Sequence, residues 1–345
     1  MVDKGFASDN ISGVHPQILK AINEANMGHV DAYGEDQYTI SALKKLKEAF
    51  GNDTEAFFVF NGTGANVLAL ASIVSSLNSI ICSNLAHLNL DECAAPENFI
   101  GCKLIPVQNE AGKLTVKNIK PYIYGFGDPH HAQPKVISIT QSTELGTVYS
   151  DHEVKAIADL AHDNQMFIHM DGARLSNAAV SLGKSLKEIS FDLGVDILTF
   201  GGTKNGLMFG EVVIFSNQDL AKNFHYLRKQ GMQLSSKMRF ISAQYNALFE
   251  HNLWYQSARH ANKMAKLLES KVSLLDGINV TRKVQANAVF VTLPGEIISL
   301  LQKEYPFYIW DESINEVRWM CSFDTTEEDI SSFVNSLSKA LSSAY

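Results

Sequence analysis

The stretches that decide the fold are Met166-Phe-Ile-His-Met-Asp-Gly-Ala-Arg174 and Asp196-Ile-Leu-Thr-Phe-Gly-Gly-Thr-Lys204. Each is an apolar run of strand length that passes into a short segment with glycine and charged residues. Asp171 therefore comes at the end of one predicted buried strand, and Lys204 comes just past the end of another. In open α/β sheets ligands bind outside the carboxyl ends of the strands, so we expect these two side chains to lie at a common site.

Helices and further strands alternate through the first 247 residues, which predicts crossover connections and a mostly parallel sheet covered on both faces. A helix at 38–50 carries apolar residues on one face and ends at Gly51, a residue suited to the end of a helix. A helix at 151–164 follows Ser150, and Glu153 completes a capping box. The predicted strands are 56–60, 79–82, 103–107, 135–140, 166–170, 196–200 and 211–215.

The pattern changes after about residue 248, where short strands and helices indicate a small antiparallel sheet. A last helix is predicted to start near Thr325, with Glu328 as its capping partner. We therefore predict an N-terminal segment (1–14), a large three-layer α/β domain (15–247) and a small C-terminal α+β domain (248–345). The elements predicted in the small domain are helices at 249–268 and 297–304 and strands at 279–283, 288–293, 307–310 and 317–323.

Composition narrows the partners that the protein is expected to bind. The 345 residues carry a net charge of −8, which argues against nucleic acid or an anionic membrane as the main partner. The first ten residues contain no apolar signal segment, and the most apolar stretch, 67–82, is too polar and too short to span a membrane. The four cysteines (Cys82, Cys93, Cys102 and Cys321) match neither a zinc pattern nor a disulfide framework. We expect a cytoplasmic protein with reduced cysteines and no metal.

The pair of Asp171 and Lys204 meets the chemical needs of pyridoxal 5′-phosphate. The pyridine nitrogen of this cofactor needs a carboxylate to keep it protonated, and its aldehyde needs an amine. Burial and nearby positive charge favour the deprotonated, reactive form of such a lysine. A lone aspartate at a strand end is more often a cap, and a lone lysine after two glycines is more often a solvated loop residue. The two together, in this order and context, are much more specific.

The cofactor phosphate also needs a binding turn, and Phe60-Asn-Gly-Thr-Gly-Ala-Asn66 follows a predicted strand and opens an apolar helix. Glycine lets backbone amides approach an anion, Thr63 adds a hydroxyl, and the helix N-terminus adds positive partial charge. The run is neither a Walker loop nor a Gly-x-Gly-x-x-Gly fingerprint. Glycine-rich turns before helices are common, so the run alone is a weak signal.

Taken with these residues, several further motifs resemble the low-specificity L-threonine aldolases of the pyridoxal-phosphate-dependent beta-eliminating lyase family. The resemblance extends from about residue 6 to residue 335, and it implies an aspartate-aminotransferase-like fold and a homodimer or homotetramer with shared sites. The motifs are Phe6-Ala-Ser-Asp-Asn-Ile-Ser-Gly13, Asp31-Ala-Tyr-Gly-Glu-Asp36, Asn61-Gly-Thr-Gly64, Ala86-His-Leu-Asn-Leu-Asp-Glu92, His169-Met-Asp-Gly-Ala-Arg174, Gly201-Gly-Thr-Lys204 and Val317-Arg318-Trp319.

The resemblance implies a role for each cofactor-binding residue. Lys204 matches the Schiff-base lysine, and Asp171 matches the partner of the pyridine nitrogen. Gly62 and Thr63 match the phosphate-binding turn. His87 matches the histidine that stacks on the ring. Arg174 matches an arginine near both the cofactor O3′ and the substrate.

The resemblance also implies which residues bind the amino-acid substrate. Ser8 and Arg318 match the groups that hold its α-carboxylate, where a planar guanidinium suits bidentate binding. His130 aligns with a second catalytic histidine near the substrate hydroxyl, although His131 is adjacent. The competing interpretations are a core histidine at position 87, a loop residue at position 130 and a surface ion pair at Arg318.

The chain departs from the family pattern at one position near the phosphate. Many relatives carry an arginine in a Gly-Met-Arg-Gln run, but this chain reads Gly231-Met-Gln-Leu234. Arg228, Lys229 or Lys237 is a candidate replacement for that arginine, from the same subunit or from a neighbouring one.

The implied reaction is the retro-aldol cleavage of L-threonine, L-allo-threonine and related β-hydroxy-α-amino acids to glycine and an aldehyde. Three candidates remain for the group that accepts the β-hydroxyl proton: His87, His130 and an ordered water. The same cofactor residues would also serve β-elimination or transamination, because the orientation of the scissile bond selects among these reactions. A third reading, an inactive scaffold, is disfavoured by the retention of Lys204, Asp171 and His87.

Overall fold

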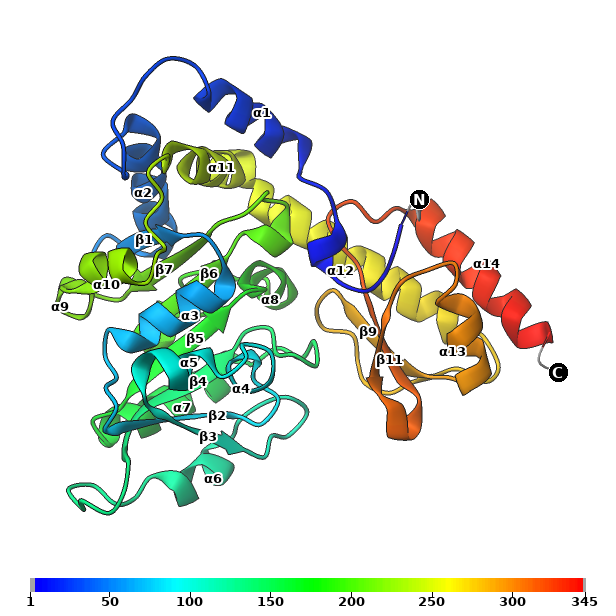
Figure 1. Cartoon of the computed structure of the whole chain (residues 1–345). Helices are drawn as coiled ribbons and strands as arrows, with labels where there is room; N and C mark the ends of the chain where they lie inside the picture. The colour runs from blue at the N-terminus through cyan, green and yellow to red at the C-terminus, as the bar shows by residue number, and fades with distance from the viewer. Residues whose placement is uncertain (1–3, 344–345) are drawn as a thin grey trace.

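A seven-stranded mixed sheet forms the centre of the large part of the molecule (Figure 1), with the strand order β1-β7-β6-β5-β4-β2-β3. The strands from β3 to β6 run parallel, and β7 is antiparallel to both of its neighbours. The structure is a computed structural model that describes residues 4–343; residues 1–3 and 344–345, at the ends of the predicted N-terminal segment and small domain, lie outside it. The strands are β1 (Glu55–Val59), β2 (Asn78–Ser83), β3 (Lys103–Val107), β4 (Gln133–Thr140), β5 (Phe167–Gly172), β6 (Ile197–Gly201) and β7 (Glu211–Phe215).

The central strands are apolar on both faces because helices cover both sides of the sheet. In β6, Leu198 and Phe200 pack in one core with α7, whereas Ile197 packs in another with α3. This alternation is the one expected of a buried strand in a three-layer fold, and the predicted α/β class is confirmed. The helices of this part are α1 (Pro16–Ala25), α2 (Gln37–Phe50), α3 (Gly62–Ala71), α4 (His87–Leu90), α5 (Ala95–Ile100), α6 (Val116–Ile119), α7 (Asp151–Asp163), α8 (Leu175–Leu182), α9 (Gln218–Ala221), α10 (Phe224–Gln230) and α11 (Arg239–Phe249).

Local capping signals explain where several helices begin and end. The capping box of Ser150 and Glu153 is present at the start of α7. Gly51 follows α2 with a φ of 123°, which a residue with a side chain rarely adopts. The cap expected for the last helix was wrong by one residue. Thr326 and Asp329 exchange the capping hydrogen bonds there, because the Thr325 hydroxyl instead accepts the Ser322 N–H at 2.9 Å.

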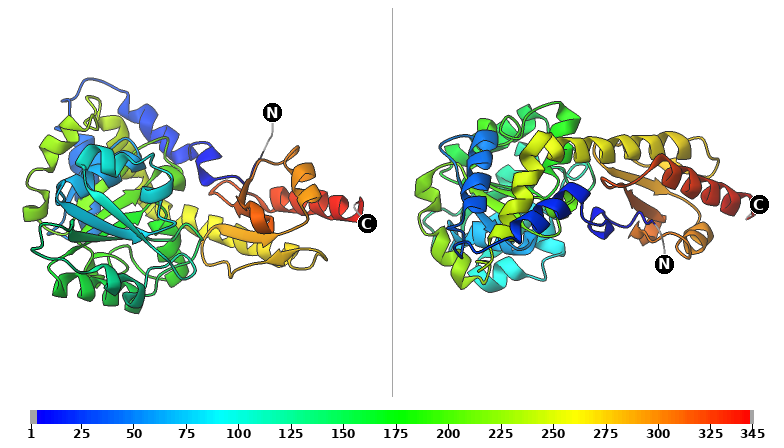
Figure 2. Two further views of the ribbon diagram at one scale, coloured as in Figure 1. Left: turned by 60° about the horizontal axis from the view of Figure 1, so that its bottom comes forward. Right: turned by 90° about the horizontal axis from the view of Figure 1, so that it is seen from above.

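The small part of the molecule contains an antiparallel sheet with the strand order β10-β11-β9-β8. The long helix α12 runs from the large part into the small one (Figure 2). Its Leu253 belongs to the large core, whereas Met264 and Leu268 belong to the small core, so the two parts share this helix. The elements are α12 (Leu253–Val272), β8 (Asn279–Val280), β9 (Ala288–Thr292), α13 (Gly295–Leu301), β10 (Tyr308–Asp311), β11 (Glu316–Met320) and α14 (Glu327–Ser343).

The N-terminal segment packs against the small part although it precedes the large one in the chain. The Phe6 N–H donates to the Pro306 carbonyl at 2.9 Å, and the Phe6 carbonyl accepts the Met320 N–H at 2.8 Å. The Phe6 ring lies 4.6 Å from the Phe333 ring, centroid to centroid, inside the small core. Short 3₁₀ turns complete the fold: η1 (Asp9–Ile11), η2 (Lys120–Tyr122), η3 (Phe191–Leu193), η4 (Thr203–Asn205), η5 (Glu250–Asn252) and η6 (Glu312–Ile314).

The Phe6→Ala substitution should lower the free energy of unfolding by about 3–5 kcal/mol, because it leaves a cavity in the small core. Urea denaturation followed by tryptophan fluorescence measures the change, since Trp319 packs in the same core. Leu274→Ala is the control, because Leu274 is 83% exposed and should shift the free energy by no more than about 0.5 kcal/mol. Equal effects of the two substitutions would show that the N-terminal segment does not belong to the small core.

Candidate active site

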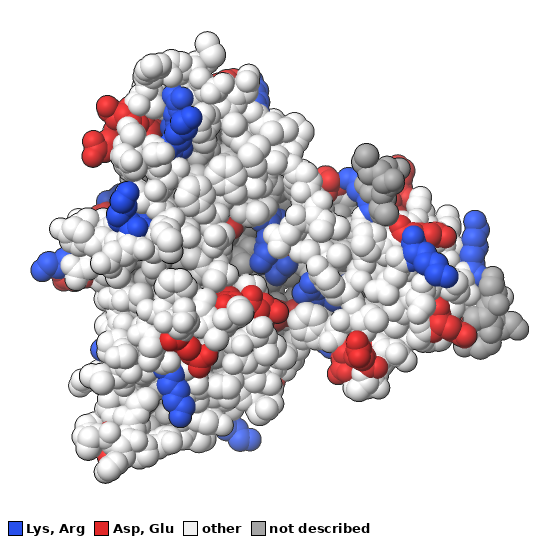
Figure 3. Space-filling view, viewed as in Figure 1, with Lys and Arg blue, Asp and Glu red and all other residues white. Residues whose placement is uncertain are grey.

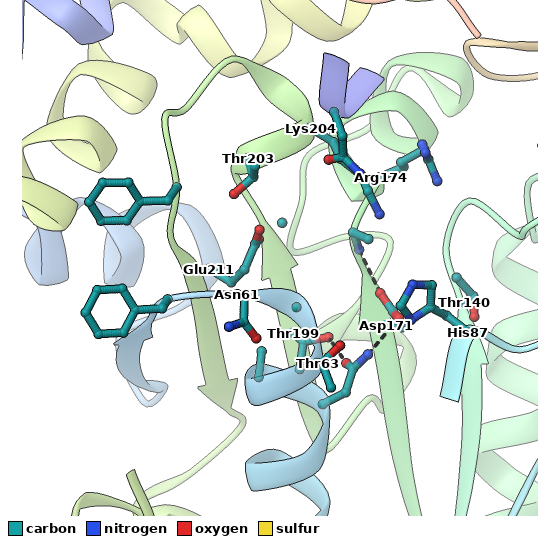
Figure 4. Close-up of a pocket in the computed structure, with 18 of the residues that line it drawn as sticks. Asn61, Thr63, His87, Thr140, Asp171, Arg174, Thr199, Thr203, Lys204 and Glu211 are labelled. Carbon is teal, nitrogen blue, oxygen red and sulfur yellow. Dashed lines mark hydrogen bonds between the residues drawn. The ribbon is translucent and has the colours of Figure 1, made fainter. Parts of the chain in front are cut away.

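A cavity of about 370 Å³ lies at the carboxyl ends of the parallel strands (Figure 4). This is the edge of the sheet at which the sequence predicted Asp171 and Lys204 to meet. Space-filling atoms show a hollow between the large and the small part, with lysine or arginine atoms inside it (Figure 3). The predicted site residues that line the cavity are Gly62, Thr63, His87, Asp171, Arg174 and Lys204.

Asp171 is held as a carboxylate near the end of β5. Its Oδ1 accepts a hydrogen bond from the Ala173 N–H at 2.9 Å, and its Oδ2 accepts one from the Asn66 side-chain amide at 2.9 Å. Burial alone would raise the pKa of this carboxyl. The positive charge of Lys204 and these hydrogen bonds outweigh burial and hold the pKa below its ordinary value. The group is therefore a buried, ionised acceptor at neutral pH.

Lys204 lies on η4, two residues after the paired glycines Gly201 and Gly202 at the end of β6. A Cβ at Gly201 would lie 2.6 Å from the Ala173 carbonyl oxygen, and one at Gly202 would lie 2.3 Å from Leu207. The chain can follow this path only without side chains at these two positions. Within residues 4–343, no hydrogen bond or ion pair reaches the Lys204 amine. Burial and the nearby Arg174 charge lower its pKa, which favours the nucleophilic form.

The turn before α3 presents free backbone donors to the cavity. Asn61 caps the helix, with its side-chain oxygen accepting the Gly64 N–H at 2.7 Å. The first N–H groups of a helix have no partner within it, and those of Gly62 and Thr63 bind no other described group. A Cβ at Gly62 would meet nothing within 4 Å. Such a helix terminus is suited to binding an anion.

Gln233 holds this turn without contributing a charge. Its side-chain oxygen accepts the Phe60 N–H at 2.9 Å, and a Cβ at Gly64 would lie 2.6 Å from its side chain. The three candidate replacements for the arginine do not line the cavity. Arg228 donates to the Phe58 carbonyl at 3.3 Å, and Lys229 lies over the Tyr33 ring.

His87 is oriented by two buried carboxyl groups. Its Nδ1 lies 2.8 Å from an oxygen of Glu92, and its backbone N–H donates to Glu144 at 3.1 Å. The hydrogen bond to Glu92 raises the pKa of the His87 imidazole against the opposing effect of burial. Burial raises the pKa of Glu144 to about 7. The ring is thus fixed in position beside Asp171 (Figure 4).

Asn66 connects these groups, and the sequence reasoning assigned it no role. Its side-chain nitrogen donates both to Asp171 and to Glu92, each at 2.9 Å. Its side-chain oxygen accepts the Thr199 hydroxyl at 2.7 Å. Asn66 and Glu92 are the last residues of two motifs quoted above. A polar residue at the end of each motif was therefore the sequence feature that could have identified them.

Arg174 is tied to the N-terminal segment by a bidentate ion pair. Its Nε and one terminal nitrogen each donate to Asp9 at 2.8 Å, and the Asn287 amide donates to the same carboxylate at 3.0 Å. Asp9 was overlooked, although it follows Ser8 in the quoted N-terminal motif. Ser8 itself caps η1, accepting the Asn10 N–H at 3.2 Å, and does not line the cavity.

Arg318 lies on β11 beside the cavity rather than in its wall. One terminal nitrogen donates to the Ala7 carbonyl at 3.3 Å, and the guanidinium carbon lies 5.1 Å from the centre of the Trp310 ring. The buried Nε has no hydrogen-bond partner. Burial and the Arg174 charge lower the pKa of Arg318 to about 10, so the side chain is a cation in need of an anionic partner.

His130 is the one predicted site residue that the chain carries far from Lys204. It lines a different cavity, together with His131, Tyr122 and Tyr124. The loop that bears it leads into the amino end of β4, where the Gln133 amide donates to the Gly125, Asp128 and His131 carbonyls. Because the catalytic cavity lies at the carboxyl end of this strand, the two sites are about 25 Å apart along the sheet. His130 therefore does not reach Lys204 within a single chain, and its predicted catalytic role stays a prediction.

Two further properties hold for residues 4–343. None of the helices in that range is long and apolar enough to cross a membrane. No three His, Cys, Asp or Glu side chains in the same range are arranged to hold a metal ion.

The sequence and the fold are similar to those of proteins of known class. The family model described as beta-eliminating lyase matches residues 5–294, and the chain belongs to this family. The protein is therefore an enzyme of the lyase class.

Individual relatives are similar over nearly the whole chain. The low specificity L-threonine aldolase of Pseudomonas aeruginosa is 45% identical over 94% of both chains. The structure of the threonine aldolase of Leishmania major superposes with a TM-score of 0.92 at 28% identity, covering 97% of this chain and 99% of the other. An alanine racemase of Cochliobolus carbonum is 27% identical over 84% of this chain and 75% of its own.

The Glu92→Gln substitution should lower the pKa of His87, because it removes the carboxylate whose hydrogen bond raises it. The imidazole resonances titrated by NMR would report this change. His162 pairs with Asp196 on the surface, and its imidazole resonances give an internal control that should be the same in both proteins. An unchanged His87 titration would mean that Glu92 does not govern its charge.

Proposed function

We propose that the protein cleaves L-threonine, L-allo-threonine and related β-hydroxy-α-amino acids to glycine and an aldehyde. The observation that carries this proposal is the 45% identity, over 94% of both chains, to the low specificity L-threonine aldolase of Pseudomonas aeruginosa. The similarity to the Leishmania major threonine aldolase structure supports it independently.

We propose pyridoxal 5′-phosphate as the cofactor, because the unpartnered groups of the cavity fit its parts. The free Lys204 amine suits the aldehyde, the Asp171 carboxylate suits the pyridine nitrogen, and the free N–H groups of Gly62 and Thr63 suit the phosphate. When bound, the cofactor supplies an aldehyde for amine exchange and a ring that withdraws electrons from the α-carbon of the substrate.

Residues of the chain would then bind and orient the amino acid. Arg318, whose Nε lacks a partner, would hold the substrate α-carboxylate, with Ser8 nearby on η1. Such a clamp fixes the rotation about the bond between the amino nitrogen and the α-carbon of the substrate. This rotation determines which of the other bonds to the α-carbon is broken. Asp171 keeps a proton on the ring nitrogen, because its own pKa is held low.

His87 is our candidate for the group that accepts the β-hydroxyl proton, directly or through a water. It lines the cavity, and its Nε2 remains free because Glu92 occupies Nδ1. A general base must reach the proton that it removes. His130 lies too far away in the same chain, so it could act only in the cavity of a neighbouring subunit.

β-Elimination remains the second candidate reaction. The family to which the chain belongs is named for it, and one relative is named an alanine racemase, which is neither an aldolase nor a β-eliminating enzyme. Release of pyruvate from L-serine would distinguish this reaction from aldol cleavage.

We further propose a cytoplasmic homodimer or homotetramer. Three large side chains around the turn before α3 support a subunit contact: Tyr33, Tyr226 and Met232 are each more than half exposed. The Tyr33 N–H donates to the Ser236 carbonyl at 3.0 Å, which brings two of these segments together. The cysteines of the described chain are all free, which suits a reducing compartment.

Purified protein supplied with pyridoxal 5′-phosphate should release acetaldehyde from L-threonine, measured through NADH oxidation by alcohol dehydrogenase. Lys204→Ala should lower kcat on the order of 10³-fold or more, because it removes the nucleophilic amine. Lys222→Ala, at an exposed lysine, is the matched control and should keep full activity. Wild-type protein that binds the cofactor but yields no acetaldehyde would exclude the aldolase reaction.

The Arg318→Lys substitution should raise the KM for L-threonine about 10- to 100-fold, because an ammonium cannot bind the carboxylate in a bidentate way. Initial rates over a range of L-threonine concentrations give KM and kcat separately. Arg259→Lys, at an exposed arginine of α12, should leave KM unchanged. If Arg318→Lys also left KM unchanged, the substrate carboxylate would have to be held by other groups.

A further inference from the structure

Glu211 is a buried carboxyl group of the cavity to which the proposed reaction assigns no role. It is the first residue of β7, only 8% exposed, and it lines the same cavity as Lys204. One of its oxygens accepts the Gly202 N–H at 2.8 Å. The position follows from the sheet register, which pairs Glu211 with Gly201 across β6 and β7.

Glu211 lies at the end of the cavity where an anion is expected. Figure 4 shows it near Thr203 and Asn61, on the side of the cavity opposite His87. Asn61 caps α3, whose free N–H groups at Gly62 and Thr63 line the same cavity. Glu211 and the proposed phosphate would therefore be neighbours.

Positive charge at this end is scarce. Among the described residues that line the cavity, the lysine and arginine side chains are those of Lys204 and Arg174. Arg174 is already paired with Asp9. Within one chain Gln233, whose side chain contacts the turn before α3, adds no charge there. A carboxylate at 211 would repel a phosphate dianion here, with little cation nearby to offset the repulsion.

The surroundings favour the uncharged form of Glu211. The titratable groups that face it are Lys204 on η4, Asp171 on β5 and the Tyr245 hydroxyl on α11. Burial and the Asp171 charge raise the pKa of Glu211 to about 7, although Lys204 and the hydrogen bonds from Thr203 and Gly202 oppose this shift. A phosphate dianion would add further negative charge and would raise the pKa again.

We propose that Glu211 is a carboxylic acid when the phosphate end of the cavity is occupied, and that its O–H donates a hydrogen bond to the anion. Binding of the phosphate would then take up a proton from solvent at each site above neutral pH. This positioning role rests on the proposed cofactor. Loss of the Glu211 proton would weaken cofactor binding at alkaline pH.

The direction in which pH changes the cofactor affinity follows from the linkage between proton binding and phosphate binding. Below a pH of about 7, Glu211 already carries its proton, so anion binding takes up none. At pH 8 most of the free protein has lost this proton, and binding restores about one per site. The affinity for the phosphate-bearing cofactor should therefore fall with pH above neutrality, approaching about tenfold per unit.

Isothermal titration calorimetry of the full-length protein, freed of bound aldehyde, tests the proposal. Titrations at pH 8 in two buffers of different ionisation enthalpy count the protons taken up. Two probes are compared: pyridoxal 5′-phosphate and pyridoxal, which lacks the phosphate. The difference in uptake between the two probes isolates the phosphate end and cancels contributions from Lys204 and the ring.

Wild-type protein should take up about one more proton with pyridoxal 5′-phosphate than with pyridoxal. In Glu211→Gln this difference should vanish, while the amide keeps the acceptor for the Gly202 N–H. Glu144→Gln is the matched control, because Glu144 is a second buried carboxyl with a pKa of about 7 in the same cavity. It lies by His87, away from the anion end, and its substitution should preserve the difference.

The outcomes separate this proposal from the proposed function. Equal proton uptake in wild type and Glu211→Gln, with tight binding of pyridoxal 5′-phosphate in both, would overturn the role of Glu211 and leave the cofactor assignment standing. No binding of pyridoxal 5′-phosphate to the wild type would overturn the cofactor assignment itself. Near-ultraviolet circular dichroism of each variant verifies that it is folded.

Discussion

The side chain of Asn66 is the point at which the parts of this active site are joined. Its side-chain nitrogen donates to Asp171 and to Glu92, and its side-chain oxygen accepts the Thr199 hydroxyl. Both ends of the amide therefore serve the site. The residue is 2% exposed, and an unmade hydrogen bond there would be costly. Because Asn66 lies one turn into α3, the same contacts align the anion-binding end of that helix with the carboxylate.

Three parts of the chain contribute to the cavity and its entrance. The large sheet provides the lysine and the carboxylate, the small domain provides Arg318, and the N-terminal segment provides Asp9. Neither the large nor the small part alone would form the site. The proposed recognition of the substrate carboxylate by Arg318 thus depends on how the small part is held against the large one, and α12 and the Asp9–Arg174 pair both span that junction.

The alternation of strands and helices could be predicted from the sequence, because both faces of the large sheet are buried and require apolar residues at a regular spacing. β3 and β7 were predicted to the residue, and Lys204 and Asp171 were found because strand ends converge in parallel sheets. Asn66, Glu92 and Glu211 were missed because a buried polar side chain has no periodic signature. Its partners are known only once distant segments are folded together. The position of His130 was readable from the sequence, since it precedes the predicted strand 135–140 and therefore lies at the amino end of that strand.

The pairing of Asp9 with Arg174 ties the N-terminal segment to the wall of the candidate active site. Phe6 anchors this segment in the small core, and Asp9 reaches the arginine at the cavity wall a few residues later. The carboxyl end of α14 lies at the outer end of the small domain (Figure 1). For recombinant work, an affinity handle or fusion partner is therefore better attached at the carboxyl end, where it would not crowd the mouth of the cavity or displace the segment that braces it.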